Sequence, residues 1–147
     1  MMSAAARAPR SQAIATWLAL VGGSLGLHRF YLYGARDPWA WLHPLPTLIG
    51  AYGFWRMNQF GIDDARGSTL VPLLGVMLAA TMLQAIVYGL MNQERWARRW
   101  RGGVPDAPRG WPTLVAVGLA LAVGVSIAVA TIAFTAQRYF ESVIEVR

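Results

Sequence analysis

Long uncharged hydrophobic runs alternate along the chain with short clusters of charged residues. The two longest runs cover residues 70–91 and 112–136, and neither contains an acidic or a basic side chain. At about 1.5 Å per residue, the shorter of the two would form a helix about 33 Å long, enough to cross a hydrocarbon core of about 30 Å. The pattern therefore predicts two membrane-spanning helices in the second half of the chain.

Two hydrophobic runs in the first half of the chain are less regular. Residues 11–27 carry no charge but form a short run for a membrane span. Residues 39–55 contain Pro44 and Pro46, and a proline disfavours helical geometry at the residue before it. We expect residues 37–46 to lie at the membrane interface before a short helix. A kinked or partly re-entrant hairpin is the alternative.

The four runs together predict an all-α integral membrane helical bundle, with four transmembrane segments arranged as two helical hairpins. With four spans, both termini lie on the same side of the membrane. The linker at residues 92–111 is the densest arginine cluster, so the positive-inside rule places it in the cytoplasm and both termini outside. We expect the chain to divide into four regions. Residues 1–12 form an N-terminal polar segment and residues 13–64 the first hairpin. Residues 65–111 contain the third span (70–91) and an arginine- and tryptophan-rich linker, and residues 112–147 contain the fourth span and a tail.

Composition supports lipid as the main solvent of this 147-residue chain. Hydrophobic residues make up 56% of it and charged residues 14%, against about 25% charged in average globular proteins. The chain has no cysteine, which excludes disulfides, thiolate metal sites and cysteine nucleophiles. The net charge of +6 is carried by arginine alone. It favours an anionic membrane surface over nucleic acid, because no basic stretch lies in a recognisable nucleic-acid-binding fold.

The linker at residues 92–111 predicts a short amphipathic helix on the bilayer surface. Its two tryptophans are four residues apart and share a helical face, with arginines between them. Tryptophan is enriched at membrane interfaces. The expected interfacial anchors are Trp96, Trp100, Arg98 and Arg99 in this linker, and Trp39 and Trp41 before the second hydrophobic run.

Small residues recur at four-residue spacing in the last hydrophobic run. Gly118 and Ala122 are four apart, as are Ala120, Gly124 and Ala128, and such spacing lets a neighbouring helix approach closely. The glutamine in the third run is expected to face another helix. The partner is either the third run or a second copy of the chain. The predicted packing residues are Gly118, Ala122, Gly124, Ala128 and Gln84.

No set of residues in the sequence predicts catalysis or a cofactor. His28 and His43 are the only histidines, and nothing supplies a third ligand at metal spacing. Asp63 and Asp64 are adjacent, so on a helix their side chains would point about 100° apart. No acidic residue lies within a hydrophobic run, whereas proton relays normally need one. We therefore expect a non-enzymatic protein without metal or cofactor.

One motif resembles a known family. The stretch Gly-Leu-His-Arg-Phe-Tyr-Leu at residues 26–32 is similar to the signature of the TM2 domain family, and the resemblance covers about residues 13–64. It implies two helices joined by this turn, and no chemistry. Arg29 is expected to bind lipid phosphate or to pair with Asp37, Asp63 or Asp64; simple snorkelling at a helix end is the alternative. The residues of the turn motif are Gly26, His28, Arg29, Phe30, Tyr31 and Gly34.

These observations predict a small scaffold or accessory subunit of a membrane complex. The alternative is a small channel or transporter formed by oligomerisation. The expected partners are the lipid bilayer and either other membrane subunits or further copies of the chain, without nucleic acid. The resemblance to bacterial TM2 proteins implies a multi-pass protein of the bacterial inner membrane.

Overall fold

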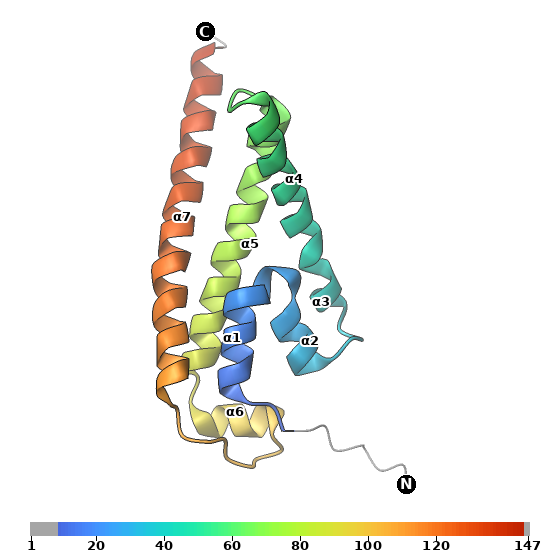
Figure 1. Ribbon diagram of the computed structural model, residues 1–147, viewed down its shortest axis with the longest axis vertical. Coiled ribbons are helices and arrows are strands. Elements are labelled where there is room, and N and C mark those ends of the chain that lie inside the picture. The colour runs from blue at the N-terminus through green and yellow to red at the C-terminus, as the bar shows by residue number, and fades with distance from the viewer. Residues whose placement is uncertain (1–8, 146–147) are drawn as a thin grey trace.

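Helix α5 (Ala65–Leu90) lies at the centre of the structure and contacts the other long helices (Figure 1). The computed structural model describes residues 9–145, and the regular elements in that range are all helices. Helix α4 (Pro44–Phe60) packs along one side of α5 and α7 (Trp111–Glu145) along another, while the shorter α1 (Gln12–Gly22) contacts both α5 and α7. The expected all-helical fold is therefore confirmed.

The chain reverses direction soon after α1. A 3₁₀ helix, η1 (Gly23–Leu25), follows, and α2 (Leu27–Tyr33) returns toward the end of the molecule at which α1 began (Figure 1). The Ser11 backbone N–H donates to the Tyr31 hydroxyl across 2.9 Å, which ties the two ends of this hairpin together. The 11 residues of α1 give a length of about 16 Å, roughly half of a hydrocarbon core. The structure thus does not show residues 11–27 as a single spanning helix.

Residues 37–46 are mostly helical, although their prolines predicted an irregular stretch. Helix α3 (Pro38–Leu42) leads through His43 into α4, and His43 keeps helical backbone angles of φ −60° and ψ −44°. Pro38 and Pro44 stand at helix starts, where the missing N–H costs little because it would have no partner within the helix. The two helices therefore follow one another along the same side of the molecule (Figure 1).

Three glycines allow α4 and α5 to pack closely. A Cβ atom on Gly50 would overlap the backbone of Leu74, and one on Gly53 would lie 2.9 Å from the backbone nitrogen of Val71. Gly67 faces Gly53 in turn, since its Cβ would lie 3.0 Å from the Gly53 carbonyl oxygen. Small residues at helix contacts are what allow backbones to approach in this way. These glycines were not among the predicted packing residues.

The contact between α5 and α7 also depends on small residues. Ala116 and Ala120 of α7 are fully buried, and a Cβ on Gly124 would lie 2.7 Å from the Cβ of Met82. Ala128 is half-buried one turn further along α7. Gly124 and Ala128 therefore lie at a helix contact, as expected, and the partner is α5 of the same chain.

Gly118 and Ala122 do not share that contact, so of the two partners left open for them, the third run of the same chain is not the one. Both residues are exposed, and no atom lies within 4 Å of a Cβ built on Gly118. The reason is helical geometry, because positions two apart differ by about 200° around the axis. When Ala120 and Gly124 face α5, residues 118 and 122 must face away from it.

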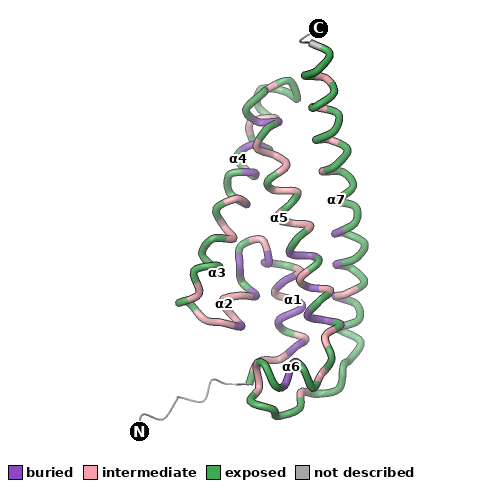
Figure 2. Tube along the Cα trace, turned by 180° about the vertical axis from the view of Figure 1, so that it is seen from behind, coloured by how far each residue is buried: buried purple, intermediate pink, exposed green. Residues whose placement is uncertain are grey.

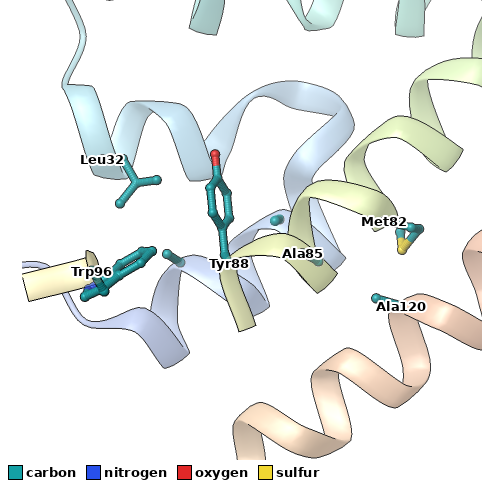
Figure 3. Close-up of a cluster of buried hydrophobic side chains, with 8 residues drawn as sticks. Leu32, Met82, Ala85, Tyr88, Trp96 and Ala120 are labelled. Carbon is teal, nitrogen blue, oxygen red and sulfur yellow. The ribbon is translucent and has the colours of Figure 1, made fainter. Parts of the chain in front are cut away.

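Helix α6 (Gln93–Trp100) lies across the end of the molecule at which α1 begins (Figure 1). Trp96 is fully buried and belongs to a cluster with Leu32, Ala85 and Tyr88 (Figure 3). Its indole N–H donates to a backbone carbonyl oxygen at the start of the chain. Trp96 is therefore not a lipid anchor as expected, because the apolar face of α6 covers the protein core.

Helix α7 is exposed along most of its length, and most of α5 is either half-buried or exposed (Figure 2). Both helices are long and apolar enough, by length and composition, to cross a membrane, with mean hydropathy of 2.2 and 2.5 over their best windows. Only 17% of each window is buried, whereas the core helix of a water-soluble protein would be mostly covered. Two of the four expected spans are thus present as suitable helices, and the structure does not show four.

The start of α1 and the end of α7 lie at opposite ends of the molecule (Figure 1). At one end, the backbone N–H of Gln12 donates to Asp106 in the loop after α6 across 2.8 Å. At the other end, Arg138 near the end of α7 lies 3.9 Å from Asp63 in the loop between α4 and α5. This arrangement differs from the expected one, in which both termini share a side, because the hairpin of α1 and α2 returns to its starting end.

Candidate functional site

The turn of the N-terminal hairpin fits closely against α3, α4 and α5. A Cβ on Gly23 would lie 2.7 Å from the Cβ of Thr81 in α5, and one on Gly26 would overlap the carbonyl oxygen of Ala40 in α3. Gly26 also has a φ of 80°, which favours glycine. The Thr47 hydroxyl of α4 lies 2.7 Å from the Ser24 carbonyl oxygen and donates to it. The glycines of the turn are thus required by the close approach of three neighbouring helices.

Arg29 stabilises the loop that joins α2 to α3, which we call a corner because the chain changes direction there. Its Nε lies 2.8 Å from an Asp37 carboxylate oxygen, and its guanidinium lies over the Tyr33 ring, 5.0 Å from the centroid. Asp37 in turn caps α3 by accepting a hydrogen bond from the Trp39 backbone N–H across 3.2 Å. The hydrogen bond from Arg29 is the main cause of a lowered pKa for Asp37. Of the partners left open for Arg29, the structure shows Asp37.

Arg56 holds the corner between α4 and α5 in the same way. Its Nε and Nη2 lie 2.9 and 2.8 Å from the two Asp64 oxygens, and its guanidinium lies 4.8 Å from the centroid of the Phe60 ring. Asp64 caps α5 by accepting a hydrogen bond from the Gly67 N–H across 2.7 Å. The Arg56 hydrogen bonds, with that from Gly67, lower the pKa of Asp64 to about 2. Neither aspartate of these corners is free to act as a catalytic base.

The two corners share one sequence pattern. An arginine is followed four residues later by Tyr or Phe, then directly by glycine, and three residues after the glycine by aspartate. Both glycines end a helix with positive φ, 87° at Gly34 and 90° at Gly61, and each N–H donates to the carbonyl four residues earlier. This repeat was not predicted, although it is visible in the sequence as Arg-x3-Tyr/Phe-Gly-x2-Asp.

A hydrogen-bond network joins the start of α1 to the end of α5. The Gln12 side-chain amide donates to the backbone oxygens of Tyr88 and Met91 across 2.7 and 2.8 Å, and so satisfies carbonyls at the C-terminus of α5. Asp106 accepts from the Gln12 N–H and forms an ion pair of 3.3 Å with Arg101. Gln12 was not predicted as a key residue, since a polar residue at a helix start gives no distinctive signal.

The predicted interfacial anchors are mostly exposed. Trp39 and Trp41 in α3 are 60% and 65% exposed, and the Trp41 indole donates to the Ala35 carbonyl oxygen across 2.9 Å. Arg98 and Arg99 are exposed on α6. Trp100 is half-buried and stacks beside Trp96, with ring centroids 4.2 Å apart. The exposure of Trp39, Trp41, Arg98 and Arg99 fits a role as interfacial anchors. Among the predicted anchors, burial excludes that role only for Trp96.

The remaining predicted residues lie against neighbouring segments of the chain. His28 is fully buried, Phe30 packs on the Trp41 ring at 5.0 Å, and the Tyr31 hydroxyl accepts the hydrogen bond from Ser11. Gln84 of α5 lies beside the His28 ring. Within residues 9–145, no group of three or more histidine, aspartate or glutamate side chains is placed to hold a metal ion.

Comparison of the chain with protein families, curated proteins and solved structures finds no match.

Proposed function

We propose that this chain is an integral membrane protein that crosses the bilayer three times. The crossings are α5, α7 and the consecutive helices α3 and α4, while α1 and α2 form a re-entrant hairpin. The low burial of the apolar surfaces of α5 and α7 supports lipid as their surroundings. The 17 residues of α4 alone give about 26 Å, and α3 adds further length. A hairpin whose helical arms are about 16 and about 10 Å long reaches only part of the way across.

The distribution of charge gives this arrangement a direction. Among the described residues, eight arginines and three acids lie at the end that carries α6, against three arginines and four acids at the other end. The positive-inside rule then places the α6 end in the cytoplasm, with the start of α1 inside and the end of α7 outside. The arginines of the α6 end are Arg10, Arg29, Arg36, Arg95, Arg98, Arg99, Arg101 and Arg109; those of the other end are Arg56, Arg66 and Arg138.

The function best supported is a non-enzymatic scaffold or accessory subunit that binds another membrane helix. One observation carries this proposal: α7 presents Gly118 and Ala122 on a face with no partner in the described chain. Small residues at this spacing are typical of helix–helix contacts in membranes. The TM2-type hairpin remains part of the proposal on the strength of the turn motif alone, and would serve to hold α5 and α7 in place.

The test of this function is the double variant Gly118→Leu/Ala122→Leu. Added side chains on the outward face should leave the fold intact, because no atom lies near Gly118, but should prevent close approach of a partner helix. We expect the variant to match the natural chain in thermal unfolding and to lose the subunit that co-purifies after mild detergent extraction. Ala130→Leu is the matched control on another exposed part of α7.

Two outcomes would contradict the scaffold proposal. One is retention of every co-purifying subunit by the double variant. The other is a homogeneous oligomer of the chain alone that conducts ions in liposomes, which would establish the channel alternative instead.

A further inference from the structure

Two histidines and a glutamine from three separate segments meet beside the hairpin turn. His28 lies in the first turn of α2, His43 joins α3 to α4, and Gln84 belongs to α5. The His28 and His43 ring centroids are 5.4 Å apart, with an interplanar angle of 70°. The Gln84 side chain lies beside the His28 ring. The fold thus brings His43 and Gln84, each distant in sequence, to the same buried imidazole.

Two of these side chains have buried polar atoms without partners. His28 has no exposed surface, and neither of its ring nitrogens makes a hydrogen bond of good geometry, although Gln84 is its polar neighbour. The Gln84 carbonyl oxygen is likewise buried and unpaired. Buried polar groups in native proteins are nearly always paired, and an exception points to a bound water molecule or ion.

The third side chain is oriented as metal-binding histidines usually are. The Nδ1 atom of His43 lies 2.7 Å from the Trp39 carbonyl oxygen. With the proton on Nδ1, this nitrogen donates to the carbonyl and Nε2 keeps its lone pair. A hydrogen bond from one ring nitrogen to a backbone carbonyl commonly fixes the tautomer and direction of a metal ligand.

We propose that His28, His43 and Gln84 bind a divalent transition metal ion, with Zn²⁺ the simplest choice. Two imidazoles on one tetrahedral zinc, with zinc–nitrogen bonds of about 2.0–2.1 Å, have ring centres about 5.2 Å apart. The observed 5.4 Å is close to that value. Imidazole nitrogen suits zinc, copper and nickel, and the amide oxygen supplies a third donor. The ion would link the hairpin to the α3–α4 junction and to α5.

The experiment uses the full chain, purified in detergent with a tag that contains no histidine. Because the chain has only two histidines, bound Co²⁺ reports on this site directly. Titration with Co²⁺ should give saturable visible absorption at one ion per chain, with the intensity of four-coordinate cobalt, and Zn²⁺ should displace it. Absence of saturable binding at micromolar metal would overturn the proposal. It would indicate that bound water pairs with the His28 ring nitrogens and the Gln84 carbonyl oxygen instead.

His43→Phe is the informative variant, because it keeps an aromatic ring beside His28 and removes the nitrogen. We expect it to weaken Co²⁺ binding about tenfold or more while helix content by circular dichroism stays unchanged. Gln59→Leu, an exposed position near the end of α4, is the control and should bind like the natural chain. Gln84→Met is a second test should His43→Phe not fold. Unchanged affinity in a folded His43→Phe or Gln84→Met protein would exclude the site.

Discussion

At the scale of single residues, Arg29 and Arg56 each hold a corner between two helices. Each guanidinium bonds to the aspartate that caps the next helix and lies over an aromatic ring one turn further along its own helix. Such a contact combines an ion pair, a cap and a cation–π interaction in one place. The corner at Arg56 is the better connected, since two nitrogens meet two oxygens in a bidentate pair.

The Asp64 corner predicts a dependence of stability on acid. The pKa of Asp64 is about 2 in the folded protein, below its ordinary 3.8, so the ionised form is favoured by folding. Its contribution is complete above pH 4 and is lost as the pH falls from about 4 toward about 2. We expect the melting temperature of the natural chain in detergent to fall across this range.

The matched variants are Asp64→Asn and Asp63→Asn. Asp64→Asn should melt at a lower temperature at neutral pH and show a flatter acid dependence, because it cannot ionise and no longer accepts two bonds from Arg56. Asp63 is 97% exposed, so Asp63→Asn should follow the natural chain. Parallel curves for Asp64→Asn and the natural chain would refute this account of the corner.

At the scale of elements, the packing of α4 on α5 depends on glycine more than on large apolar side chains. Gly50, Gly53 and Gly67 bring the two backbones together where bulkier residues would not fit. Several large residues of α4 instead point outward, among them Leu48, Phe54 and Trp55. In lipid such side chains carry no penalty, so close backbone contact, rather than burial of large residues, decides how these helices pair.

Gly53→Val tests this view. The new side chain would meet the backbone of Val71, which cannot rotate away, so we expect destabilisation by about 1–3 kcal/mol. Gly118→Val on the open face of α7 should change stability by no more than about 0.5 kcal/mol. Thermal or denaturant unfolding in micelles measures both. Equal stabilities of the two variants would show that α4 and α5 are not in close contact at Gly53.

At the scale of the whole molecule, the proposed re-entrant hairpin would change the side of the membrane on which the start of α1 lies. Four spans would place both termini outside, whereas three crossings and a returning hairpin place the start of α1 inside and the end of α7 outside. The two arrangements agree on the loop before α3, the loop after α6 and the C-terminus. They differ only at the N-terminus, so that is the end to measure.

Pro9→Cys makes the measurement direct, because the chain has no cysteine and Pro9 is exposed. In intact cells, a membrane-impermeant maleimide should not label Pro9→Cys until the membrane is permeabilised. Ile62→Cys at the α4–α5 corner should react at once, and Ala107→Cys after α6 only on permeabilisation. Immediate labelling of Pro9→Cys would restore the four-span arrangement and exclude the re-entrant hairpin.

Local pattern predicted several features of this protein from sequence alone. Uncharged runs longer than a bilayer core predicted the helices α5 and α7, and four-residue spacing predicted Gly124 and Ala128 as packing residues without separating them from Gly118 and Ala122. The motif around His28 and Arg29 was expected to form the turn itself, but residues 27–33 are helix α2 and the chain reverses just before them, at Gly23 to Gly26. These features depend on neighbours a few residues apart, which hydropathy and helical periodicity describe well. The two arginine–aspartate corners are also set by residues close in sequence, although they were not predicted.

Only the tertiary structure decided which helix ends lie together. Hydropathy does not distinguish a short span from a hairpin arm, so the return of α2 to the start of α1 could not be foreseen from residues 11–27. The direction of α7's small-residue faces, the burial of Trp96 and the meeting of His28 with His43 and Gln84 all follow from contacts between distant segments. Those contacts depend on how whole helices pack against one another, which cannot be predicted from the pattern of neighbouring residues.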